Sequence, residues 1–105
     1  MFRTIQSDQI DTLLNQRGYC FIDLRSKKEF LQDGLHGNLH IPFHLLAQNE
    51  HLIPKNKTVV LVCNDGKMSA MARNFINGRM RLSDVCSIEQ GLLAYASLRS
   101  NRQAS

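Results

Sequence analysis

The sequence lacks several features that would place it in a membrane, outside the cell or in a larger assembly of domains. None of its apolar runs approaches the roughly 20 residues that a membrane helix needs. The first residues, MFRTIQSDQ, carry no apolar core and no small-residue cleavage site of a secretory signal. No internal repeat or low-complexity linker divides the 105 residues. We therefore expect one cytoplasmic domain spanning residues 1–105, with no membrane partner.

The sequence also lacks the cysteine and histidine spacings of a metal site. Its three cysteines are far apart, without a CxxC pair. His36, His40 and His44 are four residues apart, but Gly37 and Pro42 interrupt any helix that would align them. We expect no metal, and we expect the cytoplasm to keep the three thiols reduced.

Positive charge is present but not concentrated. The formal net charge is +4 and the isoelectric point is about 9.3, yet no dense basic stripe and no interleaved aromatic residues occur. This pattern argues against nucleic acid as a partner. A mildly positive field would instead draw small anions toward a site.

Strand-like and helix-like patterns alternate along the chain. Strands are expected at residues 2–5, 19–24, 58–62 and 82–88. Helical segments are expected from an N-cap at Ser7 to Gly18, at 26–32, as a turn at 43–49, from Gly66 to Gly78, and at 92–98, with an irregular segment at 34–42. Such alternation is typical of an α/β domain with a largely parallel sheet, whose ligands bind at the carboxyl ends of the strands.

Cys63 stands at one such carboxyl end. It follows the apolar run Val59–Val62 and precedes a short polar loop and a helix. The thiolate form of cysteine is the nucleophile, and the N–H groups at a helix N-terminus favour negative charge there. The bland alternative is a cysteine that merely ends a strand and packs. The strand, polar loop and helix layout favours a reactive thiol, whereas Cys20 and Cys86 lie in strand-like runs and are expected to be inert and buried.

The residues around Cys63 have predictable effects on it. Gly66 permits a sharp turn, because glycine adopts positive φ without strain. Lys67 would place a positive charge near a bound anion, whereas Asp65 would repel anionic substrates. At a neighbouring strand end, Asp23 and Arg25 are candidates for an ion pair near the crevice. Arg73 is expected to lie on a solvated helix face, and Met68 to pack.

Several motifs together resemble those of the single-domain rhodaneses, which belong to the rhodanese-like sulfurtransferases. The resemblance covers nearly the whole chain. It rests on Asp23-Leu24-Arg25 followed by Glu29-Phe30, on Gly37 and Ile41-Pro42 within 33–42, on the six-residue loop Cys63–Met68 with its central Gly66, on the small Ser69, and on Gly91 with Tyr95.

The resemblance implies a rhodanese-like fold, with a mostly parallel five-stranded sheet flanked by helices on both faces. It implies a sulfur relay, in which Cys63 takes a sulfane sulfur from a donor and passes it to a thiol, to cyanide or to a protein acceptor. No metal and no organic cofactor is implied. The backbone N–H groups of the loop would hold the bound sulfur, and the implied binding residues are Asn64, Asp65, Gly66, Lys67, Met68 and Ser69.

Two loop residues leave the donor open. Met68 stands where many members of the family carry arginine, and Asp65 is unusual beside thiosulfate. Thiosulfate, a persulfide and a polysulfide therefore all remain candidate donors. The alternative function is a weakly active or inactive rhodanese-like domain that binds a protein or senses sulfide stress. The similar cell-cycle phosphatases and arsenate reductases have a loop one residue longer that ends in arginine, so phosphatase activity is disfavoured.

Overall fold

The computed structural model describes residues 3–34, 39–79, 84–88, 91–92 and 95. Five strands in this part of the chain form one sheet in the order β1-β5-β4-β2-β3, and all paired neighbours are parallel. The strands are β1 (Arg3–Ile5), β2 (Tyr19–Asp23), β3 (Leu39–His40), β4 (Thr58–Val62) and β5 (Asp84–Ile88). The expected α/β fold with a parallel five-stranded sheet is confirmed.

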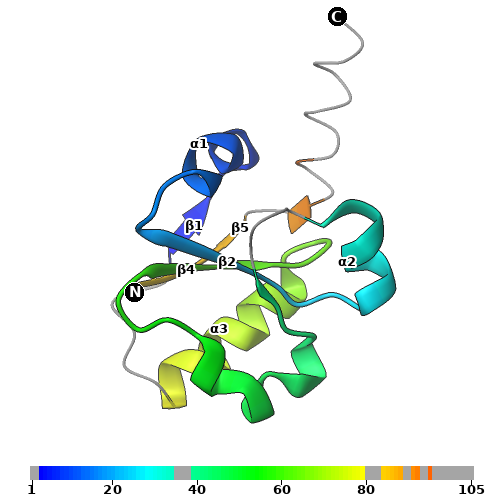
Figure 1. The fold of residues 1–105 in the computed structure, drawn as a ribbon, viewed down its shortest axis with the longest axis vertical. Coiled ribbons are helices and arrows are strands. Elements are labelled where there is room, and N and C mark those ends of the chain that lie inside the picture. Colours follow the sequence, from blue (N-terminus) through cyan, green and yellow to red (C-terminus); the bar gives the residue numbers. More distant parts are fainter. Residues whose placement is uncertain (1–2, 35–38, 80–83, 89–90, 93–94, 96–105) are drawn as a thin grey trace, which may run out of the picture.

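Helices lie on both faces of this sheet, as Figure 1 shows for α1 and α3. The α-helices are α1 (Ile10–Leu14), α2 (Lys27–Asp33) and α3 (Lys67–Arg79). Three 3-10 helices accompany them: η1 (Ser7–Gln9), η2 (Phe43–Leu45) and η3 (Ala47–Leu52). Among these described helices, none is long and apolar enough to cross a membrane.

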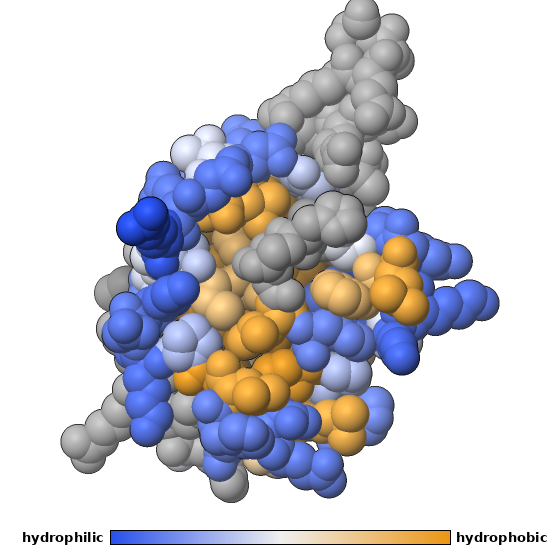
Figure 2. Space-filling view, in the orientation of Figure 1, coloured by the Kyte–Doolittle hydropathy of each residue, from blue (hydrophilic) through white to orange (hydrophobic). Residues whose placement is uncertain are grey.

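The alternation of strand side chains produces two apolar clusters, one on each face. Val60 and Val62 of β4 pack with α1 on one face, whereas Val59 and Leu61 pack with α3 on the other. A fully buried aliphatic side chain contributes about 1.5–3 kcal/mol, so the central strand holds both layers together. Figure 2 shows one surface of the molecule, where apolar residues gather across the middle and polar residues surround them.

Several sequence-based boundaries were wrong. Gln6, not Ser7, caps the first helical segment, because its backbone N–H donates to Gln9 Oε1 at 2.8 Å. That segment starts as a 3-10 turn and ends at Leu14 rather than near Gly18, since the chain leaves the helical conformation at Asn15. Gly78 lies inside α3 instead of ending it.

The 34–42 segment was expected to be irregular throughout, but it contains strand β3. Two residues are too few to show alternation, so only the pairing with β2 reveals this strand. The expected helical turn at 43–49 occurs as the 3-10 helices η2 and η3. The helix expected at 92–98 lies largely outside the described residues, as do His36, Gly37 and positions 82–83.

The burial of one charged residue and of one cysteine also differs from expectation. Arg73 is buried, and its Nη1 donates to Ser87 Oγ at 3.5 Å, so its placement on a solvated face was wrong. Cys86 is fully buried as expected, but Cys20 is only half-buried. Burial raises the pKa of the Cys20 thiol, and the charge of Lys57 opposes this effect.

Candidate active site

Cys63 lies directly beyond the last residue of the central strand β4. Its side chain is only 2% exposed. The peptide around it is fixed on both sides, because Leu24 N–H donates to Val62 O at 2.9 Å and Leu92 N–H donates to Cys63 O at 2.8 Å. The thiol therefore sits at a rigid position on the carboxyl edge of the sheet, where parallel α/β folds bind ligands.

Three hydrogen-bond donors converge on the Cys63 sulfur. The Gly66 N–H lies 3.0 Å from Sγ, the Ser69 N–H 3.3 Å and the Ser69 hydroxyl 2.9 Å. The loop can curl in this way because Gly66 has φ of 92°, as the sequence predicted. Hydrogen-bond donors aimed at one atom stabilise negative charge that develops on it. The arrangement is therefore suited to a sulfur atom that carries negative charge.

The Ser69 hydroxyl has a second acceptor within reach. Ser69 is 1% exposed, and its Oγ lies 3.2 Å from the Leu61 carbonyl oxygen. A hydroxyl carries a single hydrogen, so it donates either to the sulfur or to that carbonyl. Its preference depends on the charge of the sulfur.

Asp65 and Lys67 interact with each other through the loop backbone. The Lys67 N–H donates to Asp65 Oδ1 at 3.0 Å, so this amide is already occupied. Both side chains are exposed, and of the two only Asp65 lines the pocket next to Cys63. Lys67 is not among the residues that line this pocket, and its role beside a bound anion remains a prediction.

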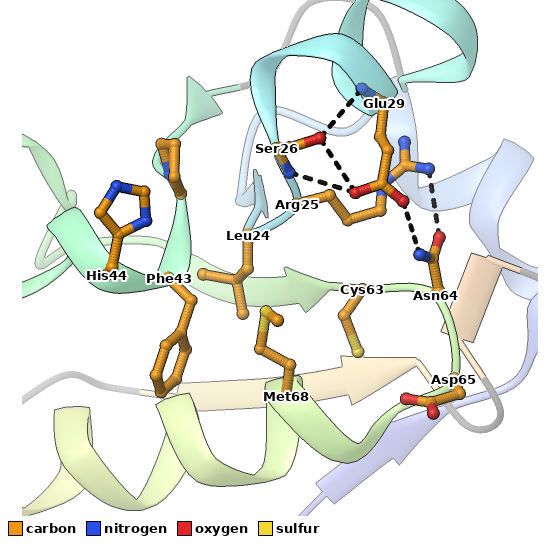
Figure 3. Close-up of a pocket in the computed structure, with 11 residues that line it drawn as sticks. Leu24, Arg25, Ser26, Glu29, Phe43, His44, Cys63, Asn64, Asp65 and Met68 are labelled. Carbon is orange, nitrogen blue, oxygen red and sulfur yellow. Dashed lines mark hydrogen bonds between the residues drawn. The ribbon is translucent and has the colours of Figure 1, made fainter.

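Asn64 ties the loop to the start of α2. Its Nδ2 donates to Glu29 Oε2 at 2.7 Å, and its Oδ1 accepts from Arg25 Nη1 at 3.3 Å (Figure 3). The bonds from Asn64, and then those from Ser26, hold the pKa of Glu29 below its usual range. Glu29 therefore remains charged at neutral pH and keeps the loop in place.

Arg25 is held by several acidic and polar partners. Its guanidinium bonds Asp23 Oδ2 at 3.0 Å and Asp33 Oδ1 at 2.8 Å. Burial alone would lower the pKa of Arg25, but the hydrogen bonds to these two carboxylates outweigh it and raise the pKa. The predicted ion pair between Asp23 and Arg25 is present, and both residues are buried.

A pocket of about 520 Å³ opens beside Cys63. The residues that line it come from the ends of β2 and β4, from α2, from the segment after β3 and from α3: Leu24, Arg25, Ser26, Glu29, Pro42, Phe43, His44, Cys63, Asn64, Asp65 and Met68. Figure 3 shows them around the sulfur. Sequence reasoning missed the apolar residues Leu24, Pro42 and Phe43 as site residues. The one available signal was the position of Leu24 just past a strand end.

The histidines do not form a metal centre in the described part of the chain. Within it, no three His, Cys, Asp or Glu side chains lie close enough to hold a metal ion. His40 stacks on the ring of Phe30 with centroids 4.5 Å apart, and its Nε2 lies 2.8 Å from Arg25 O. His40 thus packs α2 against the sheet.

Comparison with known proteins finds a matching family and a similar sequence. A family model of the rhodanese-like domain matches residues 6–98. A sulfurtransferase from Allochromatium vinosum is 26% identical over 97 residues, covering 91% of this chain and 90% of that protein.

Two solved structures show a similar fold. The crystal structure of a rhodanese-related protein from Thermoplasma volcanium has a TM-score of 0.82 at 20% identity, covering 92% of this chain and 93% of that one. A rhodanese-like domain protein from Staphylococcus aureus has a TM-score of 0.79 at 22% identity, covering 90% of this chain and 91% of that one.

Proposed function

The chain belongs to the family of rhodanese-like domains, and on that premise we propose that it is a sulfurtransferase whose Cys63 carries the transferred sulfur as a persulfide. The observation that supports this proposal most directly is the set of three donors on the buried Cys63 sulfur. The similarity to the sulfurtransferase of Allochromatium vinosum also supports it. Residues 64–69 form the binding loop of the proposal, with backbone N–H groups around the sulfur.

In the first step, the Cys63 thiolate attacks the outer sulfur of a sulfane donor. A bond forms between Sγ and that sulfur, the bond to the donor breaks, and its electron pair leaves with the donor as sulfite or as a thiolate. The thiolate must be formed and correctly oriented before this displacement. Gly66 N–H and Ser69 provide that preparation from fixed positions.

In the second step, a thiol or cyanide acceptor attacks the outer sulfur of the persulfide. The electron pair of the breaking S–S bond returns to Sγ, where the same three donors stabilise the thiolate as leaving group. Both steps are displacements at sulfur, so the enzyme alternates between two forms and ping-pong kinetics follow. Thiosulfate and cyanide form one donor and acceptor pair of this reaction class.

A binding module without turnover is the other function to test. Hydrogen-bond donors on a buried sulfur assist a nucleophile and are of no use on a docking surface, which favours the enzyme.

Intact-protein mass spectrometry after incubation with thiosulfate and, separately, with polysulfide tests the proposal. We expect one added sulfur atom that cyanide removes, and no addition to the Cys63→Ser variant. The Cys20→Ser variant is the matched control, because it removes a half-buried thiol outside the pocket and should still load. An unmodified protein under all conditions would contradict sulfur transfer and leave the binding module.

A further inference from the structure

The pocket beside Cys63 has two chemically different sides. Figure 3 shows one group, Leu24, Phe43 and Met68, to the left of the cysteine, with His44 farther out, whereas Arg25, Ser26 and Glu29 lie above the cysteine and Asn64 to its right. The first group presents only hydrocarbon and thioether surface. A ligand whose sulfur reaches Cys63 would therefore have an apolar surface next to it.

This apolar wall is held by the sheet and is already formed. Leu24 is 1% exposed, and the carbonyl oxygen of Leu24 accepts a hydrogen bond from the Phe43 N–H at 2.9 Å. Phe43 and Met68 are half-buried and pack against the apolar cluster that joins α3 to the sheet. Binding against side chains that are already fixed loses little conformational entropy, which favours affinity.

The charges in the pocket do not suit a small dianion. Among the described residues lining it, Arg25 is the only one with a guanidinium or ammonium group, and it is 4% exposed and bonded to Asp23, Asp33 and Asn64. The carboxylates of Glu29 and Asp65 also line the pocket, whereas Lys67 does not. The pocket lining thus carries more carboxylates than cationic groups, although the net charge of the whole chain is positive.

The size of the pocket leads to the same conclusion. A volume of about 520 Å³ lies within the range of sites for small organic ligands. Thiosulfate has only five heavy atoms and would leave most of this volume, including the apolar wall, without contacts.

We propose, resting on the sulfur transfer proposed above, that the donor is a low-molecular-weight organic persulfide, R–S–SH, whose uncharged apolar R group packs on Leu24, Phe43 and Met68. The Cys63 thiolate attacks the outer sulfur, the S–S bond of the donor breaks, and R–S⁻ leaves while Cys63 becomes the persulfide. No electron or proton is needed from another reagent. Phe43 and Met68 are then specificity-determining residues, and Asp65 selects against thiosulfate.

A homologous series of donors tests this inference. Ethyl, propyl, butyl and pentyl hydropersulfides have nearly equal chemical reactivity, which a small thiol in solution serves to normalise. Single-turnover loading of Cys63 is followed by mass spectrometry for each, beside thiosulfate at the same concentration. Each added methylene that is buried against the apolar wall should raise the loading efficiency about fourfold.

Matched variants assign the effect to residues. Phe43→Ala and Met68→Ala should reduce the gain per methylene, and Phe43→Leu should largely retain it, which guards against a folding defect in the alanine variant. Leu31→Ala removes an apolar side chain that is 70% exposed on α2 and should change nothing.

A second pair of variants tests the role of Asp65. Asp65→Asn keeps an acceptor for the Lys67 N–H and should speed the loading by thiosulfate only. Asp8→Asn makes the same charge change at an exposed site on η1 and should not alter thiosulfate loading.

The possible outcomes separate this inference from the proposed function. Equal loading along the series, together with thiosulfate loading as fast as pentyl hydropersulfide, would overturn the organic donor but leave sulfur transfer standing. Failure of every donor to load Cys63 would overturn both. A chain-length dependence that Phe43→Ala and Met68→Ala leave unchanged would overturn the role of the wall.

Discussion

At the scale of single residues, the Ser69 hydroxyl can respond to the charge of Cys63, because its one hydrogen can bond either Cys63 Sγ or Leu61 O. A thiolate attracts the hydroxyl more strongly than a carbonyl does, because hydrogen bonds to charged acceptors are stronger. In the persulfide, Sγ is no longer charged, and the hydroxyl can turn to Leu61 O, 3.2 Å away. Under the proposed sulfur transfer, Ser69 would thus stabilise the thiolate more than the persulfide and help Sγ leave in the second step.

Ser69→Ala should therefore weaken the nucleophile and slow sulfur release. Loss of a hydrogen bond to a charged group is worth about 1.5–3 kcal/mol, which corresponds to roughly tenfold to a hundredfold in rate. The measurements are the rate of Cys63 alkylation at neutral pH and the rate of sulfur release from the loaded protein to cyanide. Ser87→Ala removes another buried hydroxyl, bonded to Arg73, and is the control. Equal rates in both variants would show that the Ser69 hydroxyl only fills space.

Gly91 lies close against the backbone of Cys63 and Asn64. Its φ is +66°, and an added Cβ would lie 2.4 Å from Asn64 O and 2.5 Å from Cys63 O. Both contacts are to backbone, so the peptide that carries the nucleophile would have to move.

Gly91→Ala should destabilise the fold by more than about 1 kcal/mol and reduce sulfur loading in the protein that remains folded. Chemical denaturation and single-turnover loading measure the two effects. At Gly18 a Cβ would meet nothing within 4 Å and φ is not positive, so Gly18→Ala should change neither. Normal loading by Gly91→Ala would mean that the loop tolerates displacement.

At the scale of elements, the loop after β4 depends on the N-terminus of α2. Ser26 and Glu29 form a capping box, and the second carboxylate oxygen of Glu29 reaches Asn64. A residue that caps one helix thereby also fixes the loop of another. Glu29 contributes to stability as the charged form, since its pKa is lowered from 4.5 in the folded protein.

The contribution of Glu29 to stability should depend on pH in one direction. It is fully present above the unfolded pKa and is lost as the pH falls through the lower folded pKa. The difference in unfolding free energy between the wild type and Glu29→Gln should therefore be largest near neutral pH and shrink in acid. Denaturant titrations from neutral pH down to about one pH unit below the unfolded-state pKa of glutamate measure this difference in unfolding free energy.

The Asn64→Ala background provides the control for this effect. The hydrogen bond from Asn64 is the main cause of the lowered pKa of Glu29, so its removal should weaken the pH dependence. A difference that stays constant with pH in the wild-type background would contradict the role of Glu29.

Local patterns predicted some of these elements and missed others for physical reasons. Four apolar residues in succession, Val59–Val62, define most of β4, and a glycine after a strand-end cysteine indicates the turn, so Cys63 and Gly66 were placed correctly. The wall residue Phe43 was missed because a backbone bond across two segments positions it, and no local pattern encodes that bond. Arg73 was misplaced because a charged residue alone predicts solvent exposure, whereas the packing of α3 on β5 buries it.

At the scale of the whole molecule, the sheet separates two apolar clusters that should nevertheless unfold together. Ile76 is fully buried in the cluster under α3, and Cys86 is fully buried in the cluster under α1. Strands β4 and β5 contribute residues to both clusters, so neither face can lose its packing without the other. Small domains of this kind usually unfold in a single cooperative transition.

This coupling predicts that a change on one face alters thiol protection on the other. Ile76→Val should destabilise the protein by about 0.5–1.5 kcal/mol, which raises the unfolded population roughly two- to twelvefold. Because Cys86 reacts with iodoacetamide only when the chain unfolds, its alkylation rate should rise by the same factor. Peptide mapping by mass spectrometry gives this rate, and denaturant titration gives the stability change independently. An unchanged Cys86 rate in a destabilised Ile76→Val protein would show that the two faces open separately, and that the carboxyl edge bearing Cys63 can loosen without loss of the whole fold.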